Sequence, residues 1–269
     1  MSNKNIYFFS DFHLGMPPGE SSISREKKIV SILKDISSDA HSIFLLGDIF
    51  DFWFEYKEVV PKGYFRLLNT IAELTEQKIS IYIFPGNHDL WINDYIEKYC
   101  GAIVLREPQE FYYGNKKFHI HHGDGLGPGD RKYKFLKRIF QNKTSNFLFR
   151  WLHPDIGVSI ARWLSSKSRL AQGITGDSYL GDDKEYLTQY CNDVLKNKNS
   201  KNNPDYKEDK LIFLENDDDV VNYFVFGHRH LLLDIKLTVN SRYINLGHWL
   251  TMSNYGVFDG SDFRMISLT

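Results

Sequence analysis

Aspartate, histidine and asparagine side chains occur together in five short clusters along this chain. Each cluster follows an apolar run that is typical of a buried strand. Carboxylate, amide and imidazole groups form a mixed oxygen and nitrogen ligand set, which suits Mn, Fe or Zn better than Ca or Mg alone. The clusters therefore predict a site for two metal ions, and they are Asp11-Phe-His13, Gly47-Asp48-Ile-Phe-Asp51, Gly86-Asn87-His88-Asp89, His122-Gly-Asp124 and Gly227-His228-Arg-His230.

Each motif taken alone is weak evidence, because a turn with satisfied polar side chains explains a single Gly-Asp or Gly-His-x-His equally well. Asp11 and His13 alternate around Phe12, so an extended backbone would send both side chains to the same side. Asp48 follows a glycine that permits a sharp turn, and its two carboxylate oxygens could bridge two cations. Five such clusters in this order favour the metal site.

The elements that must position these clusters alternate along the first 125 residues. In this part, strands are expected at 6–9, 43–46, 79–84 and 118–121, and helices at 24–36, 64–77 and 90–99. The strand before the last cluster is expected at 223–226. This alternation predicts a sheet covered by helices on both faces, with ligands bound beyond the carboxyl ends of its strands. Near the C-terminus, 243–246, 255–258 and 263–267 are expected to be antiparallel strands, with a turn at Asp259-Gly260.

Residues 131–171 differ in composition from the rest of the chain. They contain ten Lys or Arg and one acid, Asp155, which gives about +9 and leaves about −10 for the remainder. Seven aromatic residues are interleaved with helical, amphipathic spacing. We expect an inserted helical cap that continues through 183–195 and ends in the polar tract 196–210.

Bulk properties allow a single large domain or one domain with an insertion. The chain has 269 residues, 42% hydrophobic content, a net charge of −1 and two cysteines, neither in a CxxC pair. No secretory leader and no run of about 20 apolar residues is visible in the sequence. A reducing cytosolic location, or one on a membrane surface, is expected.

In their order, the five clusters resemble the DxH, GD, GNHD, H and GHxH motifs of the calcineurin-like metallophosphoesterases. LGDIFDFWFEY at 46–56, HGDGLGPGD at 122–130 and a cap before GHRH are similar to the UDP-2,3-diacylglucosamine pyrophosphatases of lipid A biosynthesis. The resemblance implies an α/β fold in which a calcineurin-like β-sandwich is flanked by helices (αββα). The catalytic core would comprise 1–125 and 215–269, and the cap 126–214.

The resemblance also implies roles for individual residues. Asp11, His13, Asp48 and His230 would bind the first ion, and Asp48, Asn87, His122 and His228 the second. His88, which some lipid A relatives replace by arginine, would stabilise the transition state or the leaving oxygen. Asp89 would orient the His88 ring, although helix N-capping explains Asp89 and Asp51 equally well. Asp124 is expected to support His122, His119 and His121 to be strand histidines, and His248 to have a surface or supporting role.

The implied reaction is hydrolysis of UDP-2,3-diacylglucosamine at the α-phosphate, which gives UMP and 2,3-diacylglucosamine 1-phosphate. Two divalent ions are expected, manganese first and iron or zinc as alternatives. The lipid would be bound at the anionic cytoplasmic face of the inner membrane, without nucleic acid or an obligate protein partner. Headgroup contacts are expected from Asn87, His88, Asp130, Ser168, Arg169, Gln172 and His228.

Two other functions remain open from the sequence. Another metallophosphoesterase activity, such as a cyclic-nucleotide phosphodiesterase or a nuclease, is the first, because basic residues interleaved with aromatics also suit nucleic acid. A non-catalytic membrane-associated scaffold is the second. All seven ligand positions carry residues that can bind metal, which argues against the scaffold.

Overall fold

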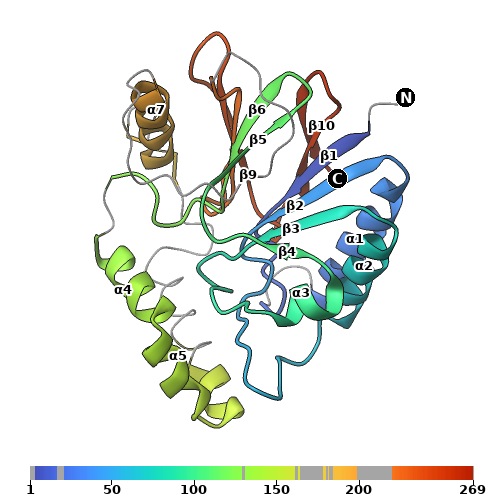
Figure 1. Cartoon of the computed structure of the whole chain (residues 1–269), viewed down its shortest axis with the longest axis vertical. Coiled ribbons are helices and arrows are strands. Elements are labelled where there is room, and N and C mark those ends of the chain that lie inside the picture. Colours follow the sequence, from blue (N-terminus) through green and yellow to red (C-terminus); the bar gives the residue numbers. More distant parts are fainter. Residues whose placement is uncertain are drawn as a thin grey trace.

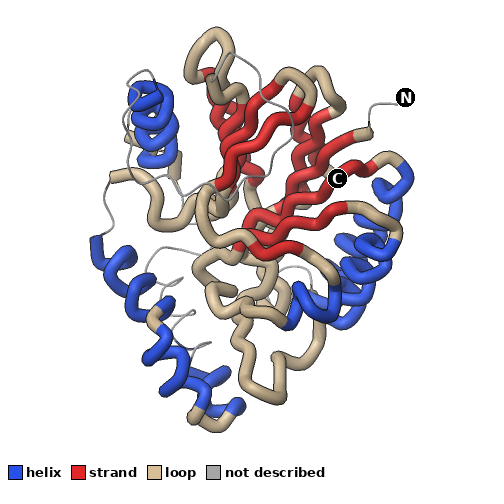
Figure 2. The backbone as a smooth tube through the Cα atoms, in the orientation of Figure 1, coloured by secondary structure: helices blue, strands red, loops and turns tan. Residues whose placement is uncertain are grey.

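Two β-sheets face each other, and helices lie on the outside of both (Figure 1). The structure is a computed structural model that describes residues 4–16, 21–128, 131–160, 163, 178–179, 181, 184–198 and 220–268. The expected αββα arrangement is confirmed. Figure 2 shows the strands grouped in the interior, with helices at the periphery and a separate helical arm.

The first sheet has six strands in the order β11-β10-β1-β2-β3-β4. The strands β1 to β4 are parallel neighbours, whereas β10 runs antiparallel to β1 and forms a hairpin with β11, as the sequence predicts. The bounds are β1 Asn5–Phe9, β2 Ala40–Leu46, β3 Ser80–Phe84, β4 Ile103–Val104, β10 Asn254–Phe258 and β11 Phe263–Ser267.

The second sheet has five strands in the order β5-β6-β7-β9-β8. Strand β9 pairs in parallel with β7, so the expectation that it would be antiparallel to the final hairpin is wrong. Strand β8 was not predicted, because it lies at the sheet edge and its residues alternate between exposed and half-buried positions. The bounds are β5 Gln109–Tyr113, β6 Lys116–Ile120, β7 Tyr223–Phe226, β8 Leu232–Lys236 and β9 Arg242–Leu246.

The two faces of the first sheet have different covers. Helices α1 (Ser22–Asp35), α2 (Phe65–Glu76) and α3 (Tyr95–Cys100) lie on its outer face, with the short 3-10 helix Ile36–Ser38 after α1 (Figure 1). The opposite face packs on the second sheet through one cluster of buried side chains from both sheets. The prediction of helices on both faces of one sheet is therefore wrong, since a sheet takes the place of the second helix layer.

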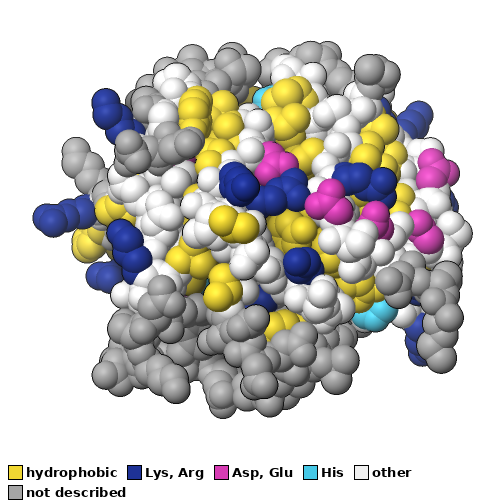
Figure 3. Space-filling view, turned by 90° about the horizontal axis from the view of Figure 1, so that it is seen from above, with side chains coloured by type: hydrophobic (Ala, Val, Ile, Leu, Met, Phe, Trp, Pro, Cys, Tyr) yellow, Lys and Arg dark blue, Asp and Glu magenta, His cyan; other side chains and the backbone are white. Residues whose placement is uncertain are grey.

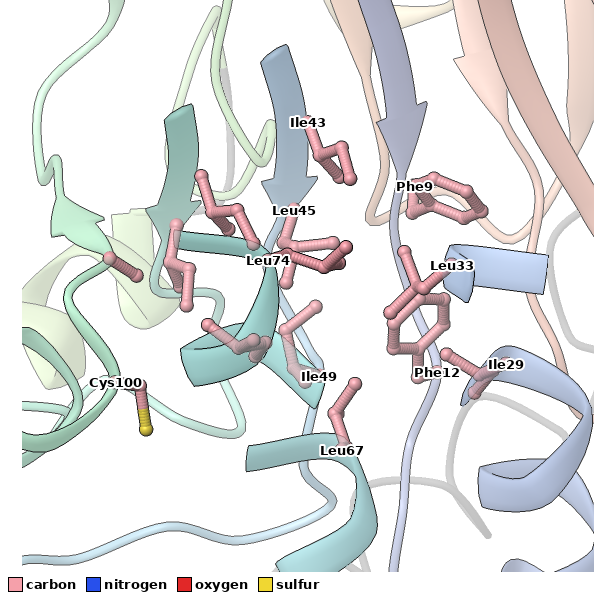
Figure 4. Packing of buried hydrophobic residues seen from close by; sticks show 14 of the residues in the cluster. Phe9, Phe12, Ile29, Leu33, Ile43, Leu45, Ile49, Leu67, Leu74 and Cys100 are labelled. Atoms are coloured by element: carbon pink, nitrogen blue, oxygen red, sulfur yellow. The ribbon is translucent and has the colours of Figure 1, made fainter. Parts of the chain in front are cut away.

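Buried side chains lock α1, α2 and α3 onto the first sheet. Figure 4 shows Ile43 and Leu45 of β2 directed toward Leu74 of α2, and Phe9 and Phe12 lying near Leu33 of α1. Burying one such side chain stabilises the fold by about 1.5–3 kcal/mol. The loops that follow β1 and β2 therefore begin at strands that this packing holds in place.

Two buried glutamates supply caps that α2 and α3 lack locally. Glu26 of α1 accepts hydrogen bonds from the backbone N–H groups of Arg66 and Leu67 at the start of α2. Glu55 accepts from three backbone N–H groups at the start of α3, those of Asn93, Asp94 and Tyr95. A carboxylate in this position satisfies helix N–H groups and complements the helix dipole.

Helices α4 (Arg131–Gln141) and α5 (Lys143–Arg150) form the arm that stands away from the sheets (Figure 1). Residues 154–160 are also helical. The arm is attached to the core through Trp91, whose Nε1–H donates to the Phe140 carbonyl at 2.8 Å and whose ring stacks on Phe149. These segments correspond to the first part of the predicted cap.

Helix α7 (Tyr186–Lys198) packs on the outer face of the second sheet instead of standing with α4 and α5. Its Leu187 and Cys191 are fully buried against Phe224 and Tyr243 of that sheet. This helix lies within the predicted cap range 126–214, and its apolar face completes the core of the second sheet. Cys100 and Cys191 are both buried and free.

Among the described residues, no helix is both long and apolar enough to cross a bilayer. Figure 3 views the molecule from above and shows basic and acidic side chains interspersed with hydrophobic ones on that face. That face therefore carries charge of both signs.

Candidate metal centre

The first group of predicted ligands comes together between the end of β1 and the loop after β7. One ligand atom from each of Asp11, His13, Asp48 and His230 lies within 4.8 Å of the others. His13 Nε2 is 2.9 Å from His230 Nε2, and His230 Nε2 is 3.2 Å from Asp11 Oδ1. The structure thus assembles the four residues assigned to the first ion.

The second group shares Asp48 with the first. Asp48, His122 and His228 also place one ligand atom each within 4.8 Å of one another, and Asn87 Oδ1 lies 3.3 Å from His122 Nε2. Asp48 Oδ2 is 3.8 Å from His13 Nε2 and 3.5 Å from His122 Nε2. One carboxylate oxygen therefore faces both groups, as a bridging ligand must.

Hydrogen bonds within this site leave metal-ligand atoms available. The Leu46 carbonyl lies 2.7 Å from His122 Nδ1, which places a proton on Nδ1 and leaves the Nε2 lone pair for a ligand bond. Asp11 Oδ2 accepts the His228 N–H, whereas Asp11 Oδ1 is buried, accepts no hydrogen bond and faces His13 Nε2 at 3.7 Å and His230 Nε2 at 3.2 Å. A buried carboxylate oxygen that accepts no hydrogen bond is costly, and a cation held between it and the two imidazoles would satisfy it. The residues present fit divalent metal ions.

The electrostatics of the ion-free site also favour a cation. Burial alone would raise the pKa of Asp48, but the imidazoles of His122, His88 and His13 hold it far below its usual range. Burial lowers the pKa of His122, yet the Asp48 carboxylate outweighs burial and raises it to about 10. The pocket therefore stabilises positive charge beside Asp48, which is the charge that a metal ion brings.

The backbone at the ligands is left-handed. Seven described non-glycine residues have a positive φ, and five of them are predicted ligands: Asp11, His13, Asp48, His228 and His230. The expectation of an extended backbone at Asp11 and His13 is wrong, since their φ values are 54° and 45°. The two side chains converge because each residue turns the chain, not because they alternate along a strand.

Two glycines are required by the close approach of the ligands. Gly47 has a φ of 82°, and a Cβ there would lie 2.4 Å from the His122 ring. A Cβ on Gly86 would lie 2.3 Å from Asp48 Oδ1. The expected sharp turn before Asp48 is confirmed.

His88 lies beside the first group, with its ring 5.0 Å from that of His13. Its Nδ1 is 3.1 Å from the Asp51 carbonyl and 3.7 Å from Asp51 Oδ1, so Asp51 sets the ring orientation. Asp89 does not orient this ring. Its carboxylate accepts from the backbone N–H groups of Gly86, Ile49 and Phe50, which joins the loops after β2 and β3.

Helix N-capping is also excluded for Asp89 and Asp51. The residue before α3 is Asp94, and Glu55 caps that helix. Burial and the Asp48 charge raise the pKa of Asp89 to about 7.

Asp124 does not support His122, which already pairs with Leu46. Its Oδ2 accepts from the Tyr133 hydroxyl at 2.5 Å and from Lys137 Nζ at 2.7 Å, both on α4. Burial would raise the pKa of Asp124, but Lys137 foremost holds it below its usual range. Asp124 therefore anchors the cap to the loop that carries His122.

The remaining histidines lie in the interior. His119 in β6 contacts Glu110 and the Tyr190 hydroxyl, and His121 directly after β6 accepts the Gly123 N–H, so both belong to the strand region as expected. His248 is 3% exposed, so the surface alternative is wrong, and its ring lies 5.2 Å from that of His230. Burial foremost lowers the pKa of His248 to about 4.

The expected headgroup residues of the cap, Asp130, Ser168, Arg169 and Gln172, lie outside the described residues. Asn87, His88 and His228 are at the metal centre as described above.

Two buried arginines near the ligands were missed. Arg25 of α1 is fully buried and donates to the carbonyls of Phe12, His13 and Met16, which hold the loop after β1. Arg229 forms a buried two-point ion pair with Glu185 directly before α7. The only signal in the sequence was the position of Arg229 between two predicted ligands.

Comparison with known proteins agrees with the motif order. The family description "Calcineurin-like phosphoesterase" matches residues 4–232. The UDP-2,3-diacylglucosamine hydrolase of Porphyromonas gingivalis (strain ATCC BAA-308 / W83) is 34% identical over 272 residues, covering 98% of this chain and 97% of that protein.

A second curated relative and a solved structure are less similar to this chain. A UDP-2,3-diacylglucosamine hydrolase of Haemophilus influenzae (strain ATCC 51907 / DSM 11121 / KW20 / Rd) is 29% identical over 168 residues, covering 61% of this chain and 68% of that protein. Among solved structures, the phosphoesterase Yfce from E. coli gives a TM-score of 0.41 at 12% identity, covering 94% of this chain and 87% of that one. Since the family match spans most of the chain and the first relative covers nearly all of it, the chain belongs to the calcineurin-like phosphoesterases.

Proposed function

We propose that this protein hydrolyses the diphosphate of UDP-2,3-diacylglucosamine at the α-phosphate and releases UMP and 2,3-diacylglucosamine 1-phosphate. The observation that carries the proposal is the end-to-end match to the P. gingivalis hydrolase. The assembly of both predicted ligand groups in the structure supports it.

Asp11, His13, Asp48 and His230 would hold one divalent ion, and Asp48, Asn87, His122 and His228 a second, with manganese proposed from the mixed ligand set. When bound, such a pair of ions lowers the pKa of water and neutralises charge on phosphoryl oxygens. The Leu46 carbonyl holds a proton on His122 Nδ1, so Nε2 is the nitrogen that would serve as the ligand atom. His88 Nδ1 faces the Asp51 carbonyl, which leaves Nε2 as the ring nitrogen that can face the leaving oxygen.

The arm of α4 and α5 is proposed to select a lipid. Phe147 and Trp151 are 58% and 78% exposed, and neighbouring apolar residues are exposed as well: Phe135, Leu136, Leu148, Leu152, Ile156 and Trp163. So many exposed large apolar side chains within residues 135–163 are unusual on a protein that faces only water. Together with the +9 charge of 131–171, it supports contact with acyl chains and with an anionic cytoplasmic membrane surface.

The substrate is tested by measuring UMP release from the UDP-lipid, with a cyclic nucleotide and single-stranded DNA assayed in parallel with added manganese. We expect turnover of the UDP-lipid to exceed that of the other two by a wide margin. Preferred turnover of the cyclic nucleotide or of DNA would refute the substrate. Absence of any turnover would indicate a non-catalytic protein.

The lipid contact is tested by replacing Phe147 and Trp151 with serine. Hydrolysis of the diacylated lipid should fall much more than that of a small chromogenic phosphodiester. Wild type should also favour longer acyl chains, since each buried CH₂ contributes about 0.8 kcal/mol. Phe65 and Tyr99 are exposed aromatics on α2 and α3 and serve as matched control positions. Equal losses on both substrates would contradict a lipid role.

A further inference from the structure

His248 is held rigidly next to the first ligand group although the metal assignment does not use it. It follows β9, and its ring lies 5.2 Å from that of His230. The next residue, Trp249, donates its backbone N–H to the Asp11 carbonyl at 3.0 Å. The Leu250 backbone N–H donates to His248 Nδ1 at 3.1 Å. Backbone hydrogen bonds thus fix the ring relative to Asp11 and His230.

The Leu250 contact determines where the ring carries its proton. A backbone N–H can only donate to a nitrogen with a free lone pair, so Nδ1 is unprotonated and the neutral ring has its proton on Nε2. Within the described part of the chain, no residue hydrogen-bonds to Nε2. Among the described residues, the Nε2–H of His248 therefore has no hydrogen-bond acceptor.

The groups around His248 limit which acceptors its Nε2–H can reach. His248 is not part of the groups whose ligand atoms cluster for a metal ion. The rings of His88, His13, His230 and His248 follow one another at centroid distances of 5.0, 4.9 and 5.2 Å. His88 and His248 thus lie at the two ends of this row. A neutral His88 carries its proton on Nδ1, toward Asp51, whereas His248 carries it on Nε2.

We propose that His248 contacts the substrate and donates its Nε2–H to a phosphoryl oxygen bound beside Asp11, His13 and His230. This proposal rests on the proposed phosphohydrolase function, but not on the identity of the lipid. A phosphoryl oxygen is the acceptor that the reaction brings to this place. A preformed neutral donor stabilises its negative charge without proton transfer.

Two substitutions separate donation from a merely structural role. His248→Asn keeps an acceptor for the Leu250 N–H near the Nδ1 position but removes the donor. His248→Gln places an amide N–H near the Nε2 position but loses the Leu250 acceptor. A hydrogen bond to a charged acceptor contributes about 1.5–3 kcal/mol, which corresponds to about ten- to hundredfold. We expect His248→Asn to lose that factor in kcat/KM for a small phosphodiester and His248→Gln to retain most of the wild-type value.

A second readout, independent of turnover, is the binding of inorganic phosphate to the manganese-loaded proteins, measured by calorimetry. The phosphate affinities of the two variants should rank in the same order as their kcat/KM values. Long-range ¹H–¹⁵N spectra of the wild type, with His248 assigned by its loss in the variants, should show the proton on Nε2. Manganese content should match wild type in both variants, and both should be folded at the assay temperature. The proposal is overturned if His248→Gln is the more impaired variant, if the proton is on Nδ1, or if His248→Asn loses manganese. Wild type that hydrolyses the small diester but not the UDP-lipid would refute the substrate and leave this test intact.

Discussion

The buried ion pair between Glu185 and Arg229 leads to a prediction with a defined magnitude. The Arg229 guanidinium donates through Nε and Nη2 to the two Glu185 oxygens at 2.5 and 2.9 Å, and Glu185 is 1% exposed. Glu185→Ala removes the carboxylate from a buried guanidinium. Breaking such a pair from one side costs about 3–5 kcal/mol. At about 2 °C per kcal/mol for a chain of this size, the unfolding temperature should fall by about 6–10 °C.

Arg242 and Asp234 provide a matched control on the surface. They form a similar two-point pair, but their side chains are 28% and 41% exposed. Asp234→Ala should therefore cost less than about 1 kcal/mol. Both variants are compared by thermal and urea unfolding followed by circular dichroism at one pH. A Glu185→Ala effect no larger than that of Asp234→Ala would refute the reasoning.

The same variant tests whether the pair matters for the site. Arg229 lies between His228 and His230, and Glu185 directly precedes α7 on the second sheet. Loss of the pair should loosen the loop that carries both ligands, so manganese affinity measured at limiting metal should fall. Unchanged affinity at a temperature where the variant is folded would limit the role of the pair to the packing of α7.

Three further predictions concern the ligands and the thiols. Asp48→Asn should lower turnover by about 10³-fold or more while the fold survives, because the bridging charge is lost; near-normal turnover of a metal-replete variant would contradict bridging. His88→Ala should lower turnover by about 10²-fold or more with metal content unchanged, and loss of an ion in elemental analysis would make His88 a ligand. Burial raises the pKa of Cys100 to about 11 and that of Cys191 well above its ordinary value. Because the folded state holds the Cys100 proton more tightly, the contribution of this thiol to stability is full below about pH 9 and is lost as pH rises through about 11. Iodoacetamide at pH 8 should label both only after urea unfolding; rapid labelling of the folded protein would show that they are accessible.

Sequence patterns located the buried strands well. The apolar runs before the clusters correspond to β1, β2, β3, β6 and β7, since strands covered on both faces are apolar throughout. The edge strand β8 was not predicted, because its side chains alternate between exposed and half-buried positions. The assignment of β9 failed for another reason. A local pattern predicts a strand but not which strand lies beside it. Strand β9 pairs directly with β7, although β8 lies between them in the sequence.

Residue types predicted which groups would meet, but not their hydrogen-bond partners. Asp89 and Asp124 are carboxylates in the expected clusters, yet one binds backbone N–H groups and the other binds Tyr133 and Lys137. A carboxylate accepts from any N–H or O–H within reach. Its partner is therefore decided by the packing of segments far apart in the sequence, which a local motif does not contain.

The left-handed backbone conformation of the ligand residues was not predicted from the motifs. A non-glycine residue in this region costs about 1–3 kcal/mol and persists only where its surroundings enforce it. Here the Asp11 carbonyl accepts from Trp249, the His13 carbonyl accepts from Arg25, and Asp11 Oδ2 holds the His228 N–H. These bonds come from a loop after β9, from α1 and from the loop after β7. The ligand positions are therefore enforced by the assembled sandwich.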